Sequence, residues 1–215
     1  MITAVVPVKT YSERLPRKNL SPFLDTTLYE YKLKQLAQVP FDSIVVSSEA
    51  REVLWIARKY GFSTHLRNPK YSTSSVPMSK VWSYIASEIR GTDIAWVNVT
   101  NPLFGPNLYK KALEMYRYKR DYDCLLSVYN LQKYVWWKGK PVNFQPYPHP
   151  RSQDLKGLYA QSFAINICPR RDLIERGTSV GEKPLFFVTD TISGTKIDYK
   201  ADLDFCEMMV RRRQS

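Results

Sequence analysis

The strongest constraint on the fold is an alternation of short apolar runs with longer segments in which apolar residues recur at helical spacing. We predict strands from the short runs, which cover residues 3–8, 43–47, 64–67, 93–99, 124–128, 162–167 and 195–198. We predict helices from the longer segments, which cover residues 28–36, 51–60, 81–89 and 108–118 and a last stretch from Asp202. Strands that alternate with helices build βαβ units, so this pattern predicts a three-layer α/β/α fold around a mainly parallel sheet.

The length of 215 residues suits a single α/β domain, residues 1–215, with a sizeable core and no sequence repeat of fixed period. The apolar start, residues 1–8, lacks a basic region and is too short to cross a bilayer, and no other run is long enough. We therefore expect a soluble protein with no membrane partner. Cys124, Cys168 and Cys206 are scattered and odd in number, which favours reduced thiols and a cytoplasmic location.

The chain is basic, with 32 Lys and Arg residues against 20 Asp and Glu residues and a formal net charge of +12, which favours an anionic partner. Nucleic acid, a nucleotide and an acidic metabolite all satisfy this condition. Lys9, Arg14, Arg17 and Lys18 follow the first predicted strand, where the loops of a parallel sheet border the ligand crevice. Such a loop suits a polyphosphate. A basic loop facing solvent is the alternative, because the glycine spacing of Walker and dinucleotide motifs is missing.

Several motifs occur in the same order as in a known family. Residues 15–19, Leu-Pro-Arg-Lys-Asn, match Leu-Pro-x-Lys-Asn. Further segments resemble Val-Ser-Thr-Asp, Leu-Gln-Pro-Thr-Ser-Pro-Leu, Arg-x-Gln-x-Leu, Asn-Gly-Ala-Ile and Ser-Ile-Asp-Ile-Asp; they are residues 45–49, 97–103, 151–155, 162–165 and 196–204. Over nearly its whole length the sequence therefore resembles the CMP-N-acylneuraminate synthetase (acylneuraminate cytidylyltransferase) family.

The resemblance implies a Rossmann-like nucleotidyltransferase fold and transfer of CMP from CTP to an acidic, sialic-acid-like 2-keto sugar, with release of pyrophosphate. The anomeric hydroxyl of the sugar would attack the α-phosphorus of CTP. Such transfers depend on positioning and on neutralising phosphate charge, for which Lys, Arg and Mg²⁺ are suited. N-acylneuraminate, legionaminate, pseudaminate and 3-deoxy-octulosonate all remain candidate acids.

The resemblance also implies roles for residues on the nucleotide side. Lys18 contacts the triphosphate with Lys9 as a second contact, and both are predicted to be catalytic. Asn19 holds the nucleotide, and Ser74 or Ser75 contacts the base or the ribose. The predicted nucleotide-binding residues are Val8, Lys9, Lys18, Asn19, Arg67, Ser74 and Ser75.

On the sugar side, the implied contacts are Asn98, Arg151 and Gln153. Arg151 could bind a carboxylate or phosphate in bidentate fashion, or it could be an ordinary surface arginine. Asp198, expected at a strand end, is the predicted Mg²⁺ ligand and the third catalytic residue, because Mg²⁺ takes one or two carboxylates alongside phosphates and water. The alternative role for Asp198 is to cap the helix that follows.

The sequence departs from the family pattern at several positions. Thr10 and Tyr11 replace a Gly-Gly pair, which matters if positive φ is required there. Glu13 replaces a Lys, Ala160 an Arg, and Lys200 a second metal-binding Asp whose strand face it would share with the first. Either Lys200 neutralises phosphate directly and an active enzyme takes an altered sugar, or the site only binds its ligands. We expect activity, because most implied site residues are present.

Residues 130–157 form an irregular excursion with four prolines and the aromatic residues Tyr134, Trp136 and Trp137. In position it resembles the arm through which the family dimerises, so we expect a homodimer. A flap that covers the core is the alternative.

A nucleic-acid-binding protein is the main hypothesis of another class, given the +12 charge and the 15 Tyr and 5 Trp residues. The cations are spread along the chain and no RNA- or DNA-binding motif occurs, so we expect no nucleic-acid partner. Tight oligonucleotide binding with a steep salt dependence would support this alternative. A glycosyltransferase with an Asp-x-Asp motif is weaker, because residues 202–204, Asp-Leu-Asp, lie at the start of the last predicted helix.

Overall fold

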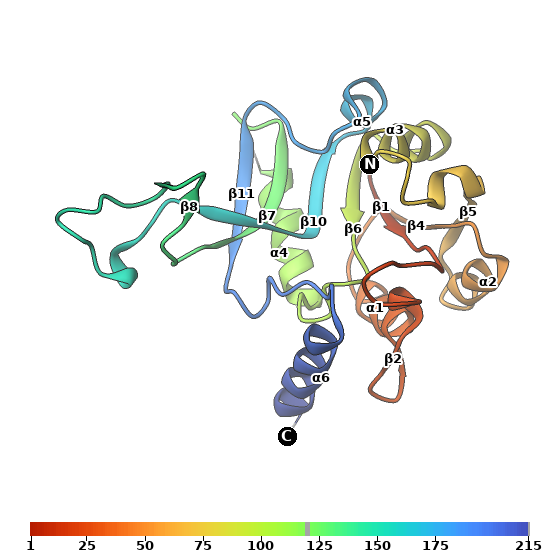
Figure 1. The fold of residues 1–215 in the computed structure, drawn as a ribbon. Coiled ribbons are helices and arrows are strands. Elements are labelled where there is room, and N and C mark those ends of the chain that lie inside the picture. Colours follow the sequence, from red (N-terminus) through yellow and green to blue (C-terminus); the bar gives the residue numbers. More distant parts are fainter. Residues whose placement is uncertain (119–120, 215) are drawn as a thin grey trace.

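A seven-stranded sheet runs through the part of the chain that the computed structural model describes, residues 1–118 and 121–214 (Figure 1). Its strand order is β11-β7-β10-β6-β1-β4-β5. The strands are β1 (Ile2–Pro7), β4 (Ser43–Ser48), β5 (Ser63–Leu66), β6 (Asp93–Val97), β7 (Cys124–Asn130), β10 (Tyr159–Pro169) and β11 (Pro184–Thr189). Only β10 runs antiparallel to its neighbours, β6 and β7, so the prediction of a mainly parallel sheet is confirmed.

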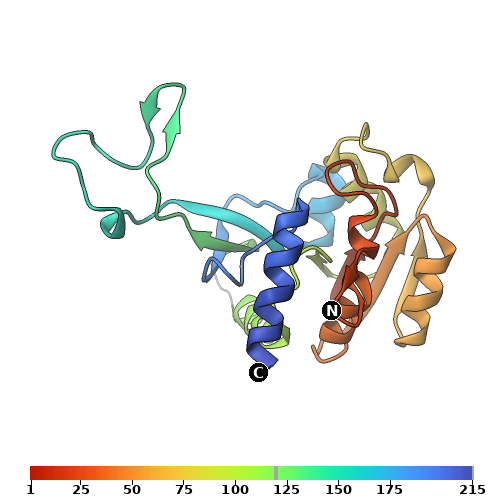
Figure 2. The ribbon, with the colours of Figure 1, turned by 60° about the horizontal axis from the view of Figure 1, so that its bottom comes forward.

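Helices cover both faces of the sheet. They are α1 (Leu28–Leu36), α2 (Arg51–Lys59), α3 (Met78–Glu88), α4 (Pro106–Arg117), α5 (Arg170–Arg176) and α6 (Lys200–Gln214). Side chains alternate across β1, so that Ala4 and Val6 join the core under α1, α2, α4 and α6, whereas Val5 joins the core under α3 and α5. Figure 2 shows α6 in front, between α4 and α1. The three-layer α/β/α prediction is confirmed.

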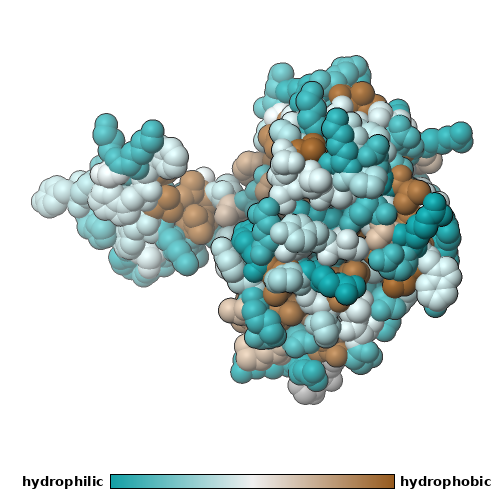
Figure 3. Space-filling model, turned by 45° about the vertical axis from the view of Figure 1, so that its right-hand side comes forward, coloured by the Kyte–Doolittle hydropathy of each residue, from teal (hydrophilic) through white to brown (hydrophobic). Residues whose placement is uncertain are grey.

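Residues 131–158, between β7 and β10, leave the sheet as an extended arm that stands clear of the body (Figure 3). The backbone N–H of Leu131 donates to the carbonyl of Leu158 at 2.8 Å and closes the base of the arm. The arm contains β8 (Trp136–Trp137), β9 (Lys140–Pro141) and the short helix η3 (Ser152–Asp154). A second small sheet, β2 (Pro22–Phe23) with β3 (Thr26–Thr27), and the short helices η1 (Lys18–Leu20) and η2 (Pro69–Ser72) complete the described fold.

Three predictions about individual elements need correction. Residues 195–198 are not a strand: the Ile197 N–H donates to the Thr100 carbonyl at 2.8 Å, but the segment pairs with no described strand. The strand β11 and the helix α5 were not predicted, although both form. The last helix begins at Lys200, ahead of the predicted Asp202. In the described part of the chain, no helix has the length and apolar character needed to span a bilayer.

Candidate active site

The carboxyl ends of β1, β4 and β6 lie at one edge of the sheet, and the loops that follow β1 and β5 border a cavity of about 480 Å³. We call it the first cavity. Its polar lining is Lys9, Ser12, Lys18, Asn19, Arg67, Tyr71, Ser72, Thr73, Ser74 and Thr100, and its apolar lining is Pro7, Val76, Pro77, Met78 and Val81. A crevice outside the carboxyl ends of parallel strands is the usual ligand site of open α/β sheets.

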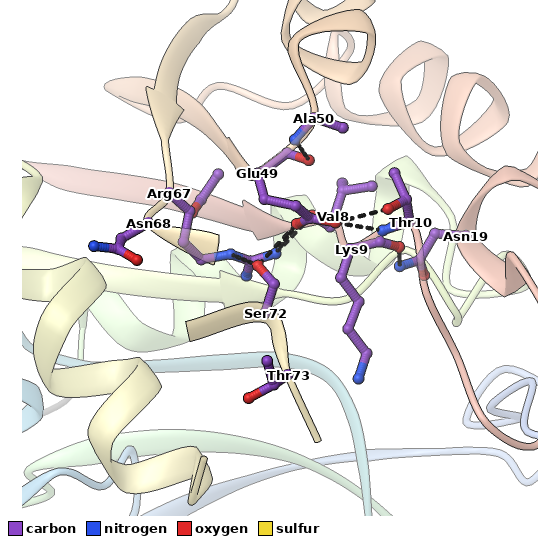
Figure 4. A network of polar contacts seen from close by, with 12 residues as sticks. Val8, Lys9, Thr10, Asn19, Glu49, Ala50, Arg67, Asn68, Ser72 and Thr73 are labelled. Atoms are coloured by element: carbon purple, nitrogen blue, oxygen red, sulfur yellow. Dashed lines mark hydrogen bonds and ion pairs between the residues drawn. The ribbon is translucent and has the colours of Figure 1, made fainter. Parts of the chain in front are cut away.

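The carboxylate of Glu49, just after β4, holds the loop that follows β1 (Figure 4). Oε1 accepts from the backbone N–H of Thr10 at 2.8 Å and from its hydroxyl at 2.9 Å. Oε2 accepts from Arg67 Nη2 and from Ser72 Oγ, both at 2.9 Å. Arg67 Nη2 also donates to the carbonyl of Val8 at 2.7 Å, so one partly buried network joins the ends of β1, β4 and β5 to η2.

This network changes what the loop after β1 can offer a phosphate. The backbone N–H of Thr10 is already engaged by Glu49, so side chains such as Lys9 are the donors that the loop presents to the first cavity. Thr10 and Tyr11 do not need the conformation of the glycines they replace, because neither is among the described residues with positive φ. The left-handed turn of this loop falls at Arg17, with φ 51°.

Hydrogen bonds lower the pKa of Glu49 to about 2, since those from Thr10, Arg67 and Ser72 outweigh burial, which alone would raise it. A carboxyl pKa that is lower in the folded chain stabilises the fold above about pH 4.5, and this contribution is lost as the pH falls towards 2. We expect the stability advantage of the wild type over Glu49→Gln to shrink across that range, measured as urea midpoints. Parallel pH curves for the two proteins would contradict this expectation.

A second feature of the site is a cluster of cations around Asp198. Lys18, on η1 and only 9% exposed, donates from Nζ to Asp198 Oδ1 at 2.9 Å. Arg14 Nη2 lies 2.9 Å from the same oxygen, and Lys196 Nζ lies 3.6 Å from Oδ2. Burial lowers the pKa of Lys18, and the bond to Asp198 opposes that shift. Burial would raise the pKa of Asp198, but Lys18, Lys196 and Arg14 lower it, so this carboxylate is ionised.

A second cavity of about 430 Å³ borders the same ion cluster at Lys196 and Asp198. Its lining is Tyr129, Gln161, Ser162, Phe163, Thr191, Gly194, Thr195, Lys196 and Asp198. Because Asp198 lines the second cavity and Lys18 lines the first, the two cavities meet at the Lys18–Asp198 ion pair. A reaction between two ligands, one in each cavity, would take place beside this pair.

Most residues predicted for the nucleotide side lie at the first cavity. Lys9, Lys18, Asn19, Arg67 and Ser74 line it, and Val8 joins it through its carbonyl on Arg67. Asn19 Nδ2 donates to the carbonyl of Lys9 at 3.0 Å and so fixes that residue's backbone. Ser75 does not line the cavity and instead exchanges a hydrogen bond with Thr73.

The residues predicted for the sugar side are scattered in this chain. Asn98 Nδ2 donates to the carbonyl of Phe163 at 2.9 Å; Phe163 lines the second cavity, and Asn98 does not. Arg151 is on the arm, where its exposed guanidinium forms a bidentate pair with Asp154 at 2.7 and 3.0 Å. Gln153, also on the arm, is exposed. Neither arm residue lines the two cavities.

The expected strand-end position of Asp198 and the expected strand face of Lys200 need correction. Asp198 lies in the segment before α6 and does not cap it; Asp202 Oδ2 accepts the backbone N–H groups of Asp198 and Tyr199 at 2.9 and 2.8 Å. Lys200 is the first residue of α6 and pairs with Asp204 one turn later, so it shares no strand face with Asp198. Lys196 supplies the cation beside Asp198 instead. Its position in the same closing motif, two residues before Asp198, was the available sequence signal.

Asp198 is the one acidic side chain among the described residues that line the two cavities. No group of three or more His, Cys, Asp or Glu side chains able to hold an ion occurs in residues 1–118 and 121–214. Mg²⁺ commonly takes one or two carboxylates and completes its shell with phosphate oxygens and water. The donor set therefore fits Mg²⁺ only in that mode, with Asp198 beside a bound phosphate chain.

The fold and the site define a class of protein: an α/β protein whose basic loop, at the carboxyl edge of a parallel sheet, borders a cavity suited to a nucleotide. A family model described as "Cytidylyltransferase" matches residues 3–205. The chain therefore belongs to the cytidylyltransferase family, which confirms the resemblance seen in its motifs.

Individual relatives are distant but cover most of the chain. N-acylneuraminate cytidylyltransferase A of Danio rerio is 24% identical over 221 residues, 98% of this chain and 51% of that protein. Pseudaminic acid cytidylyltransferase of Campylobacter jejuni is 24% identical over 220 residues, 96% of this chain and 95% of that protein. The structure of CMP:2-keto-3-deoxy-manno-octonic acid synthetase complexed with CTP has a TM-score of 0.71 at 13% identity and covers 99% of both chains. The chain spans about half the length of the fish relatives.

Proposed function

We propose that this protein is a cytidylyltransferase that transfers CMP from CTP to an acidic 2-keto sugar and releases pyrophosphate. The main support for the proposal is the partly buried Lys18–Asp198 ion pair at the meeting of two cavities. Membership of the cytidylyltransferase family supports the nucleotide, and relatives named for N-acylneuraminate, pseudaminic acid and 2-keto-3-deoxy-manno-octonic acid support the acid.

In this proposal the first cavity holds CTP. The apolar lining, from Pro7 and from residues 76–78, packs against the pyrimidine and the ribose. Lys9 and Lys18 face the triphosphate and neutralise its charge, while Arg67 acts through Glu49 to fix the loop that carries Lys9. A fixed loop reduces the ordering that must accompany binding.

The second cavity holds the acid, with its carboxylate near Lys196. The anomeric hydroxyl attacks the α-phosphorus and loses its proton to solvent, a P–O bond forms, and the bond to the pyrophosphate oxygen breaks. Lys18, released from Asp198 to phosphate, stabilises the charge that develops on the leaving group. Mg²⁺, held by Asp198 and the phosphates, would supply further charge neutralisation. Lys18, Lys9 and Asp198 are therefore the proposed catalytic residues.

The enzyme hypothesis is tested by pyrophosphate release from CTP and Mg²⁺ with a panel of 2-keto sugar acids. We expect release with at least one acid and little release when UTP or ATP replaces CTP. Measurable CTP binding without release for any acid would contradict the proposal and support the binding-only alternative. A steep salt-dependent affinity for unrelated oligonucleotides would instead support a nucleic-acid-binding protein.

We also propose a homodimer that assembles through the arm, in a cytoplasmic compartment suited to the three buried cysteine thiols. The arm presents Trp136, Trp137 and Tyr147 to solvent, at 57%, 68% and 90% exposure, and a lone two-stranded hairpin is at best marginally stable in water. A partner surface would cover these rings. Arg151 and Gln153 remain candidate sugar contacts only across such a dimer, because they lie on the arm and away from the cavities of their own chain.

Light scattering tests the dimer. We expect a mass near twice 25.1 kDa at micromolar protein, and a shift towards the monomer for Trp136→Ser combined with Trp137→Ser. Trp55→Ser is the matched control, because Trp55 on α2 is equally exposed, at 57%, but lies on the body. A wild-type mass of about 25 kDa, or an equal shift in the control, would contradict the proposal.

A further inference from the structure

Phe163, in the middle of β10, has a left-handed backbone with φ 57°. A bulky residue in this region is a genuine outlier, because its Cβ lies too close to the backbone. The Asn-Gly-Ala-Ile motif that residues 162–165 resemble has glycine at this position, where the left-handed conformation costs little. The chain therefore keeps a phenylalanine at a place that favours glycine.

The surrounding structure fixes this conformation from both sides. The pairing of β10 with β7 changes register between Gln161 and Asn166. Before the outlier, Ser162 Oγ donates to Ser127, whose hydroxyl also accepts from the Ile165 N–H at 3.0 Å. The carbonyl of Phe163 itself accepts from Asn98 Nδ2 at 2.9 Å. Strained backbone of this kind persists where several neighbouring interactions hold it in place, and it occurs most often at ligand sites.

The strained residue lines the second cavity, together with Lys196 and Asp198. A phenyl ring offers a ligand an apolar surface without hydrogen-bonding groups. Gln161 lines the same cavity, and its amide nitrogen is a buried donor that has no hydrogen-bond partner among the described residues. The cavity thus combines a cation, an unused donor and an apolar ring, which is a lining that can distinguish one polar acid from another.

We propose that Phe163 is a specificity-determining residue for the acid in the second cavity, an inference that rests on the proposed function. The ring selects 2-keto sugar acids that place a C–H or methyl group against it, and it disfavours acids that place a hydroxyl there. A hydroxyl buried against the ring loses its hydrogen bonds to water and gains none, whereas an apolar group gains contact. The strain at residue 163 is retained because the ring determines which acid binds.

Three variants separate the ring from the backbone. Phe163→Gly and Phe163→Asn remove the ring and suit a left-handed backbone, whereas Phe163→Ala removes the ring and keeps an unsuited Cβ. We expect Phe163→Gly to have a higher Tm than Phe163→Ala, although glycine has the more flexible unfolded chain. An equal or lower Tm for the glycine variant would overturn the strained conformation on which the inference stands.

The acid preference is measured by direct binding, calorimetrically, of paired deoxy and hydroxyl-bearing 2-keto sugar acids in the presence of CTP. We expect the wild type to prefer the deoxy member and the glycine variant to lose at least tenfold of that preference, with CTP affinity within twofold. An unchanged preference, or a wild type that binds none of the acids, would overturn the inference. Binding without pyrophosphate release would contradict the proposed function alone, since the preference can still be measured.

Discussion

Replacing Lys18 with Met should lower kcat for pyrophosphate release by about 10²–10³, the usual cost of removing one donor that stabilises transition-state charge. Lys18 is buried at the meeting of the two cavities, with its Nζ 2.9 Å from Asp198, so no other side chain of η1 can replace it. The fold should survive, because Arg14 and Lys196 still neutralise Asp198. The measurement is steady-state kinetics at saturating CTP and acid.

The control is Lys110→Met, an exposed lysine of α4 that is outside both cavities. It removes the same charge from the chain and should leave kcat within about twofold, since it is remote from the reacting atoms. A Lys18→Met enzyme that keeps more than a tenth of the wild-type kcat would show that the buried ammonium is not the group that stabilises the leaving pyrophosphate.

Replacing Arg67 with Met should lower the free energy of unfolding by about 3–5 kcal/mol, as expected when one partner of a buried ion pair is removed. Arg67 is 3% exposed and donates to Val8, Glu49 and Ser72. Its loss removes a donor from the buried Val8 carbonyl and leaves the half-buried Glu49 carboxylate with its bonds from Thr10 and Ser72 but without its cation. CTP affinity should fall as well, because the loop after β1 is held through Glu49. Urea denaturation and calorimetric CTP titration measure the two effects.

Two further variants test the cause of that loss. Adding Glu49→Gln to Arg67→Met removes the carboxylate charge that has lost its cation, and it should restore part of the stability. Arg151→Met breaks an ion pair that is 72% exposed on its arginine side, and it should cost at most about 1 kcal/mol. If Arg67→Met and Arg151→Met destabilise the protein equally, the network around Glu49 does not organise the site.

The sequence predicts the fold well where the signal is periodic. Apolar runs and helical spacing predict most of the strands and the larger helices, because buried faces repeat every two residues in a strand and every three or four in a helix. Residues 195–198 were predicted as a strand for the same reason, because Ile197 alternates with polar neighbours. This pattern does not show whether another strand lies beside the segment to pair with it. Ile197 is fully buried, but its backbone N–H donates to Thr100, which lies in the turn after β6 and not in a strand.

The site could be predicted only where its residues lie in local motifs. Lys9, Lys18 and Asn19 follow β1 in sequence, and their place at the first cavity follows from the topology of a parallel sheet. The pairing of Lys18 with Asp198 joins residues 180 positions apart, and no spacing rule predicts it. Lys200 was predicted to share a strand face with Asp198. It instead begins α6, where it pairs with Asp204 one turn later.

The structure also shows which of the chain's surplus cations lie at the site. The formal net charge of +12 favours an anionic partner without identifying it. The cations that meet Asp198 are Arg14, Lys18 and Lys196, a cluster that one carboxylate holds in place. In the proposed function, the negative charge of the triphosphate would compete with that carboxylate for Lys18.

The central claim is that the two cavities hold CTP and a 2-keto sugar acid whose reaction joins CMP to the acid. Mass spectrometry of the products, with pyrophosphate measured in the same samples, tests it most directly. We expect a CMP-linked acid and pyrophosphate to accumulate in equal amounts, and neither to form with Lys18→Met on the same timescale. CTP that binds and stays intact in the presence of every acid tested, or pyrophosphate that forms without a CMP-linked acid, would contradict it.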